Sequence, residues 1–129
     1  MPGYPIYAGT KSGVLRSLES LAIEYKNLET KRWINYLGPG IMATDMVLTQ
    51  KERYRSDANL RSQLKIKNFE SLTEEVSETN INSTKFAIKC LLSSTFDGVT
   101  GKFFSSSWDQ WNNPVKLALS AEECTDSYS

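Results

Sequence analysis

The sequence predicts an α/β fold in which a few parallel strands are flanked by helices, and three observations support this prediction. Residues 7–27 repeat apolar side chains every three or four positions, which is typical of one helical face. Residues 32–37 form a nearly continuous apolar run, as expected for a parallel strand covered on both faces. In residues 100–106, Phe103 and Phe104 are expected on opposite faces of a closing strand.

The helix expected at 7–27 begins with a tyrosine and a lysine. Tyr7 and Lys11 are four positions apart, so they lie one turn apart on the same helical face. An ammonium group beside a phenol favours the phenolate form, and a tyrosine in that setting is a candidate general acid/base. The alternative is a helix with one aromatic side chain and one solvated lysine. The spacing alone favours this alternative, whereas a second motif further along the chain favours proton transfer.

The second motif is the sharp turn Gly38-Pro39-Gly40, which ends the strand expected at 32–37. Ligands of open α/β sheets bind at the carboxyl ends of the strands. Thr44 follows this turn and is a candidate N-cap of the next helix, an interaction worth about 1 kcal/mol. Capping a helix and lining a ligand site are compatible roles for Thr44, and the sequence does not separate them.

These motifs together resemble the short-chain dehydrogenase/reductase family. The resemblance rests on Tyr7-Ala8-Gly9-Thr10-Lys11, on Pro39-Gly40 followed by Thr44-Asp45-Met46, and on residues 97–105 with Trp108-Asp109, in the family's order. It covers about residues 4–111 and implies the C-terminal half of a Rossmann-type doubly wound parallel sheet. It also implies a unit over residues 1–111, followed by a short helix and tail at 112–129.

The resemblance further implies an oxidoreductase that uses NAD or NADP and moves hydride between the nicotinamide and a small carbonyl or alcohol substrate. Tyr7 would be the general acid/base, and Lys11 would assist it and bind the nicotinamide ribose. The residues expected to border the nicotinamide are Pro39, Gly40, Ile41 and Thr44. Members of the family usually form homodimers or homotetramers.

Two features of that family have no counterpart in the sequence. No glycine-rich turn between a strand and a helix is present to hold a pyrophosphate, and no serine precedes Tyr7. We therefore expect a truncated chain that shows no turnover alone. The alternative is a non-catalytic remnant, or a helical association module that uses the face from Tyr7 to Tyr25.

Composition excludes several other classes of function. Lys+Arg and Asp+Glu balance at 15 each, which gives no electrostatic case for nucleic acid or an anionic membrane. The absence of histidine removes histidine triads and most zinc sites, so no metal is expected. Cys90 and Cys124 fit neither a disulfide framework nor a metal cluster. No apolar run approaches about 18 residues, so no transmembrane helix is expected, and a reducing cytoplasm is the default location.

The rest of the chain predicts helices around the strands. Residues 45–69 contain a charged helical surface and match the family's variable substrate lid in position. A helix is expected at about 72–94, capped by Ser71 or Thr73, with a break conceivable at 79–82. Trp108 and Trp111 are interpreted as packing on the end of the sheet or on a neighbouring subunit rather than stacking on a sugar.

Overall fold

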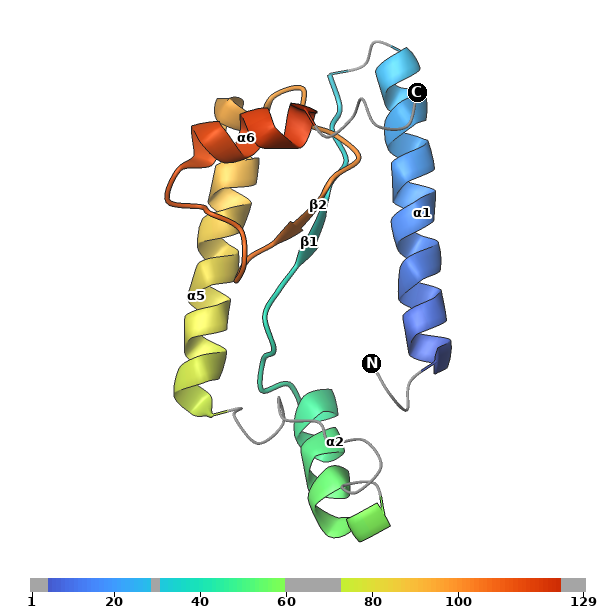
Figure 1. Ribbon diagram of the computed structural model, residues 1–129, viewed down its shortest axis with the longest axis vertical. Helices are drawn as coiled ribbons and strands as arrows, with labels where there is room; N and C mark the ends of the chain where they lie inside the picture. The colour runs from blue at the N-terminus through green and yellow to red at the C-terminus, as the bar shows by residue number, and fades with distance from the viewer. Residues whose placement is uncertain (1–4, 29–30, 60–72, 124–129) are drawn as a thin grey trace.

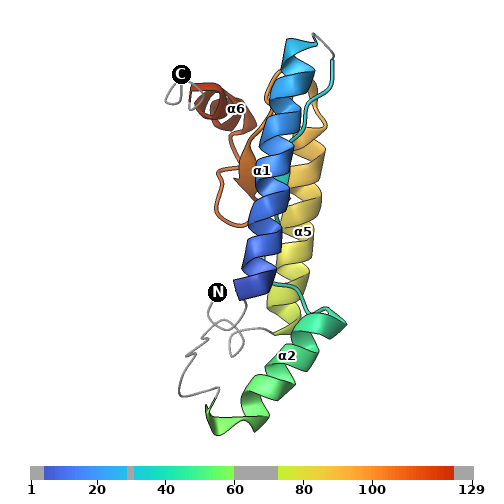
Figure 2. The ribbon, with the colours of Figure 1, turned by 90° about the vertical axis from the view of Figure 1, so that its right-hand side faces the viewer.

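The computed structural model describes residues 5–28, 31–59 and 73–123, and most of these residues are helical. The elements run α1 (Pro5–Asn27), β1 (Tyr36–Gly38), α2 (Asp45–Ser56), α5 (Glu74–Leu91), the 3₁₀ helix η1 (Ser94–Phe96), β2 (Phe103–Ser105) and α6 (Pro114–Glu123). The two strands lie between α1 on one side and α5 with α6 on the other (Figure 1). Seen from the side, α1 lies in front of the strand pair and α5 behind it (Figure 2).

Strands β1 and β2 pair in parallel, with Tyr36 opposite Phe103 and Gly38 opposite Ser105. Within the described residues the sheet has only these two strands. The expected Rossmann-type doubly wound sheet is therefore wrong, because the described part of the chain is mainly helical and its parallel pairing is confined there to two strands of three residues.

Side-chain hydrogen bonds explain why the strands are shorter than the expected 32–37 and 100–106. Asn35 accepts a bond from the Lys102 N–H at 3.1 Å and donates one to the Val99 carbonyl at 2.8 Å. The Thr100 hydroxyl accepts the Ile34 N–H at 2.9 Å. These side chains form hydrogen bonds with backbone groups that would otherwise pair between the two strands. Regular strand pairing therefore begins only at Tyr36.

The core lies on the α5 and α6 side of the strands. Its buried residues are Ala87, Phe96, Val99, Phe104, Trp111 and Ala118. Phe96 meets Phe104 edge to face, with ring centroids 5.7 Å apart, a favourable aromatic geometry. Phe104 is buried and Phe103 is exposed, so the expected alternation is confirmed. Trp111 belongs to this core, whereas Trp108 is 90% exposed, so within one chain only Trp111 packs at the end of the sheet.

Helix α1 covers the other face of the strands through a single buried residue, Ala22. A Cβ built on Gly101 would lie 3.4 Å from the Ala22 Cβ, and Gly101 has a φ of +72°. Glycine therefore fits this position both for its backbone conformation and for the close approach of α1. The helix begins at Pro5 rather than at Tyr7, because proline is well suited to the first turn of a helix.

The remaining helices begin as the sequence predicts. Thr44 caps α2 and accepts the Val47 N–H, and Thr73 caps α5 and accepts the Val76 N–H. Helix α5 is continuous through residues 79–82, so the conceivable break is not observed. Cys90 is half-buried and packs against the core. Ser71, Cys124 and residues 60–69 of the expected lid lie outside the described residues.

Candidate functional site

Tyr7 and Lys11 lie close together in the first turns of α1. The Lys11 Nζ is 5.6 Å from the centroid of the Tyr7 ring, a cation–π distance. Both side chains are exposed, with 44% of Tyr7 accessible to solvent. The Thr10 hydroxyl donates to the Tyr7 carbonyl at 2.8 Å and so bonds to the backbone rather than to the phenol. The expected pairing of Tyr7 with Lys11 is thus present in the structure.

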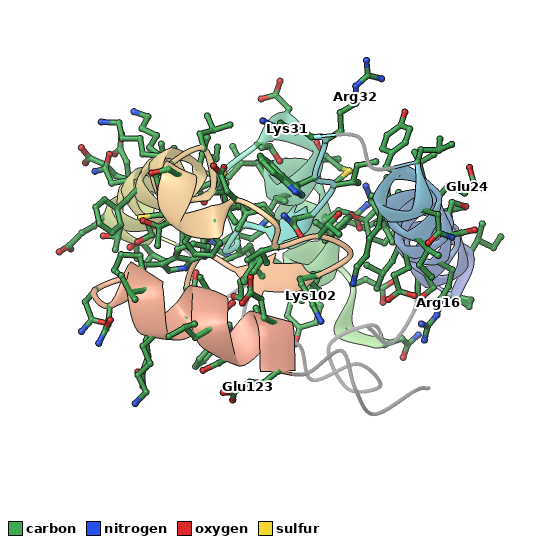
Figure 3. The ribbon with its side chains drawn as sticks, turned by 90° about the horizontal axis from the view of Figure 1, so that it is seen from above. Arg16, Glu24, Lys31, Arg32, Lys102 and Glu123 are labelled. Atoms are coloured by element: carbon green, nitrogen blue, oxygen red, sulfur yellow. The ribbon has the colours of Figure 1, made fainter. Side chains whose placement is uncertain are left out.

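Lys11 lies near the face of α1 that packs on the strands, although Lys11 and Tyr7 are both exposed. Lys11 precedes Ala22 by eleven positions, about three turns of a helix, so the two residues lie on nearly the same face. Ala22 is the residue through which α1 packs on Gly101. Arg16 and Glu24 point away from the strands on the opposite side of α1 (Figure 3). Lys11 is therefore on a different side of α1 from Arg16 and Glu24, while both members of the Tyr7–Lys11 pair remain exposed to solvent.

The second group of predicted site residues occupies the segment between β1 and α2. Pro39 is exposed, Gly40 and Ile41 are half-buried, and Thr44 is the exposed cap of α2. The segment leaves the carboxyl end of β1, at the same end of the molecule as the first turn of α1 (Figures 1 and 2). Within the described residues, no hydrogen bond or ion pair joins this segment to Tyr7 or Lys11.

Helix α5 holds this segment from the side opposite α1. The Asn80 Nδ2 donates to the Ile41 carbonyl at 2.7 Å, and the Ser77 hydroxyl accepts the Ala43 N–H at 2.9 Å. A Cβ on Gly40 would lie 2.5 Å from the Asn80 amide. Gly40 therefore packs closely on Asn80, and a larger residue there would force the side chain of Asn80 or Ser107 to shift.

Ser77 and Asn80 were not among the residues predicted for the site, although the sequence contains a signal for them. Ser77, Asn80, Thr84 and Ala87 are spaced by three or four positions and share one face of α5. Polar residues on the core face of a helix need hydrogen-bonding partners. Those partners are the turns that follow β1 and β2.

A hollow of about 560 Å³ lies between the first turns of α2 and α5, beside this segment. Its lining combines the apolar Ala43, Leu48 and Ile81 with Thr73, Glu74, Ser77 and Glu78. The charged groups among these residues are carboxylates, which disfavour a pyrophosphate at this place. The hollow accordingly suits the uncharged or cationic part of a ligand better than a phosphate.

The described residues offer neither a metal site nor a membrane-spanning helix. No group of three or more metal-ligating side chains is present there. None of the described helices combines the length and apolar character needed to cross a membrane. Comparisons of the chain with protein-family models, with curated proteins and with solved structures gave no match. The resemblance to short-chain dehydrogenases/reductases therefore rests on the motifs alone.

Proposed function

We propose that this chain supplies the acid/base residues of an oxidoreductase that interconverts a carbonyl and a hydroxyl group with NAD or NADP. One observation carries the proposal: Tyr7 and Lys11 are paired in the first turns of α1, at the end of the molecule where β1 leads into α2. The proposal requires that a ligand held by the segment after β1 bring its reacting oxygen within hydrogen-bonding reach of the Tyr7 phenol.

The proposed roles follow from the chemistry of the two side chains. In the reducing direction, Tyr7 donates its phenolic proton to the carbonyl oxygen of the substrate; in the oxidising direction, its phenolate accepts the hydroxyl proton. Lys11 donates hydrogen bonds to the ribose hydroxyls of the cofactor. When bound, a nicotinamide cofactor supplies or accepts the hydride.

Two observations support a site for the nicotinamide part of such a cofactor. No ion pair engages Lys11 within the described part of the chain, so its ammonium is available for hydroxyl groups. Hydrogen bonds with α5 hold the backbone of the segment from Pro39 to Thr44. Since no glycine-rich turn is present in the sequence, the proposal assigns the nicotinamide side of the site, and not the pyrophosphate, to these residues.

The test is a titration of the ¹⁵N-labelled chain with reduced nicotinamide mononucleotide, followed by NMR. We expect amide shifts in two places, in the first turns of α1 and in residues 39–44. Lys11→Ala should weaken binding about 10–100-fold, because a charge-assisted hydrogen bond is worth about 1.5–3 kcal/mol. Lys26→Ala is the matched control, since Lys26 is an exposed lysine in the last turn of the same helix. Unchanged spectra at millimolar ligand would refute the proposal.

Association through α1 is the second candidate function. It is favoured by the exposure of two large apolar side chains on this helix, Ile6 at 82% and Ile23 at 61%. Sedimentation velocity decides this candidate, because association through α1 predicts a concentration-dependent oligomer that Ile23→Lys reduces to monomer. A monomer at all concentrations would exclude self-association.

A further inference from the structure

Three polar residues of α5 lie where a helix usually presents apolar side chains to the core. Ser77 is 7% exposed, and Asn80 and Thr84 are half-buried. They share a face with Ala87, which is fully buried in the core. A buried polar group costs about 1–3 kcal/mol when it has no partner, so the contacts of these residues indicate what they do.

Their partners are the two turns at the carboxyl ends of the strands. Asn80 donates to the Ile41 carbonyl at 2.7 Å, and its Oδ1 accepts the Ser107 hydroxyl at 3.4 Å. The Thr84 Oγ1 lies 3.0 Å from the Ser106 Oγ. Asn80 thus touches the turn after β1 and the turn after β2 with one amide group.

Close packing, in addition to the hydrogen bond at Ile41, holds the segment after β1 against α5. The backbone of Gly40 lies so close to α5 that a Cβ would meet the Asn80 Cγ and Oδ1 at 2.5 Å and the Ser107 Oγ at 2.7 Å. Real Cβ atoms essentially never approach other heavy atoms within 3.0 Å. The segment after β1 is therefore held by a hydrogen bond at Ile41 and by direct packing at Gly40.

We propose that Asn80 is a positioning residue that sets the place of the segment from Pro39 to Thr44 relative to the Tyr7–Lys11 pair. This inference rests on the proposed function and deepens it. Asn80 acts through the backbone of Gly40 and Ile41 rather than by touching substrate. Displacement of a binding segment by about 1 Å is enough to lower the efficiency of a site about 100-fold, so the amide of Asn80 controls affinity at a distance.

The test compares Asn80→Asp with Asn82→Asp. Aspartate matches asparagine in size but replaces the Nδ2 donor by an acceptor, which would face the Ile41 carbonyl at 2.7 Å and repel it. Asn82 is exposed on the same helix and serves as the matched control. We expect Asn80→Asp to weaken binding of reduced nicotinamide mononucleotide about tenfold or more and to shift the amide resonances of residues 40–43, with Asn82→Asp unchanged in both respects.

The affinities are measured where circular dichroism shows each variant to be fully folded. A purely structural role would lower the denaturation midpoint and leave the affinity of the folded protein unchanged. Wild-type affinity in folded Asn80→Asp would overturn this inference while the proposed function stands. Absence of binding by the wild-type chain would overturn the proposed function and, with it, the role of Asn80.

Discussion

Replacement of Gly40 by alanine probes the contact between the segment after β1 and α5. The new methyl group would lie 2.5 Å from the Asn80 amide and 2.7 Å from the Ser107 hydroxyl. Asn80 must then retreat and lose its 2.7 Å bond to the Ile41 carbonyl. A lost hydrogen bond costs about 1 kcal/mol and overpacking costs about 1–3 kcal/mol. We therefore expect Gly40→Ala to lower the free energy of unfolding by about 2–4 kcal/mol.

Urea denaturation followed by tryptophan fluorescence measures this loss, because Trp111 is buried against Phe96 and Phe104. Gly13→Ala is the matched control. A Cβ on Gly13 meets nothing within 4 Å, and the residue lies inside α1. Alanine should therefore stabilise the chain there by up to about 1 kcal/mol, so the two glycine substitutions are expected to have opposite signs.

A second variant isolates the contact with Asn80. In an Asn80→Ala background the two closest atoms are gone, and only the movable hydroxyl of Ser107 remains near the new methyl group. In that background, Gly40→Ala should lower the free energy of unfolding by at least about 1 kcal/mol less than it does in the wild-type chain. This difference is the coupling energy between Gly40 and Asn80, and coupling energies between contacting residues are usually about 0.5–3 kcal/mol. An equal cost in both backgrounds, or a cost below about 0.5 kcal/mol in the wild type, would refute the reasoning.

Two further predictions concern the acid/base pair and the core. In any preparation with the proposed oxidoreductase activity, Tyr7→Phe should lower kcat about 10²–10⁴-fold, because the phenolic proton is lost. Tyr25→Phe on the same helix is the control. An unchanged kcat in Tyr7→Phe would show that Tyr7 is not the general acid/base. Phe104→Ala should lower the free energy of unfolding by about 3–5 kcal/mol, because Phe104 is 2% exposed and packs on two aromatic rings. A loss below about 1 kcal/mol on urea denaturation would show that this core is not the stabilising one.

The sequence predicts the local features of the fold well. The apolar period of three and four residues places α1, and Thr44 is identified as a cap from its position after the turn. The alternation of Phe103 and Phe104 predicts which ring is buried. Each of these predictions depends on neighbours within a few positions, where periodicity and capping rules apply directly.

The extent of the sheet could not be predicted in the same way. The apolar run at 32–37 satisfies the pattern of a buried strand, yet Asn35 and Thr100 divert the hydrogen bonds on which a longer ladder depends. A side-chain bond between residues more than sixty positions apart has no local signal. The expectation of a doubly wound sheet came from the family resemblance, and the two-stranded pairing corrects it.

Only those residues of the candidate site that are close together in the sequence could be predicted from it. Tyr7 and Lys11 were found because one helical turn joins them. Asn80 was not found, because its partners at Ile41 and Ser107 come from other parts of the chain. The sequence does place Asn80 on the core-facing side of α5, but this signal can be used only after the core-facing side of the helix has been identified.

The pairing of β1 with β2 has a consequence for the order in which the chain folds. Asn35 and Lys102, which join the strands at their start, are separated by 67 positions. Domains are synthesised at about 5–20 residues per second, so β1 waits roughly 3–13 s on the ribosome before its partner exists. During that interval α1 and α2 form from local contacts, while the apolar residues around Tyr36 have no strand to pair with. Nascent chains of this protein are consequently expected to depend on chaperones that shield this strand until the last quarter of the sequence has been made.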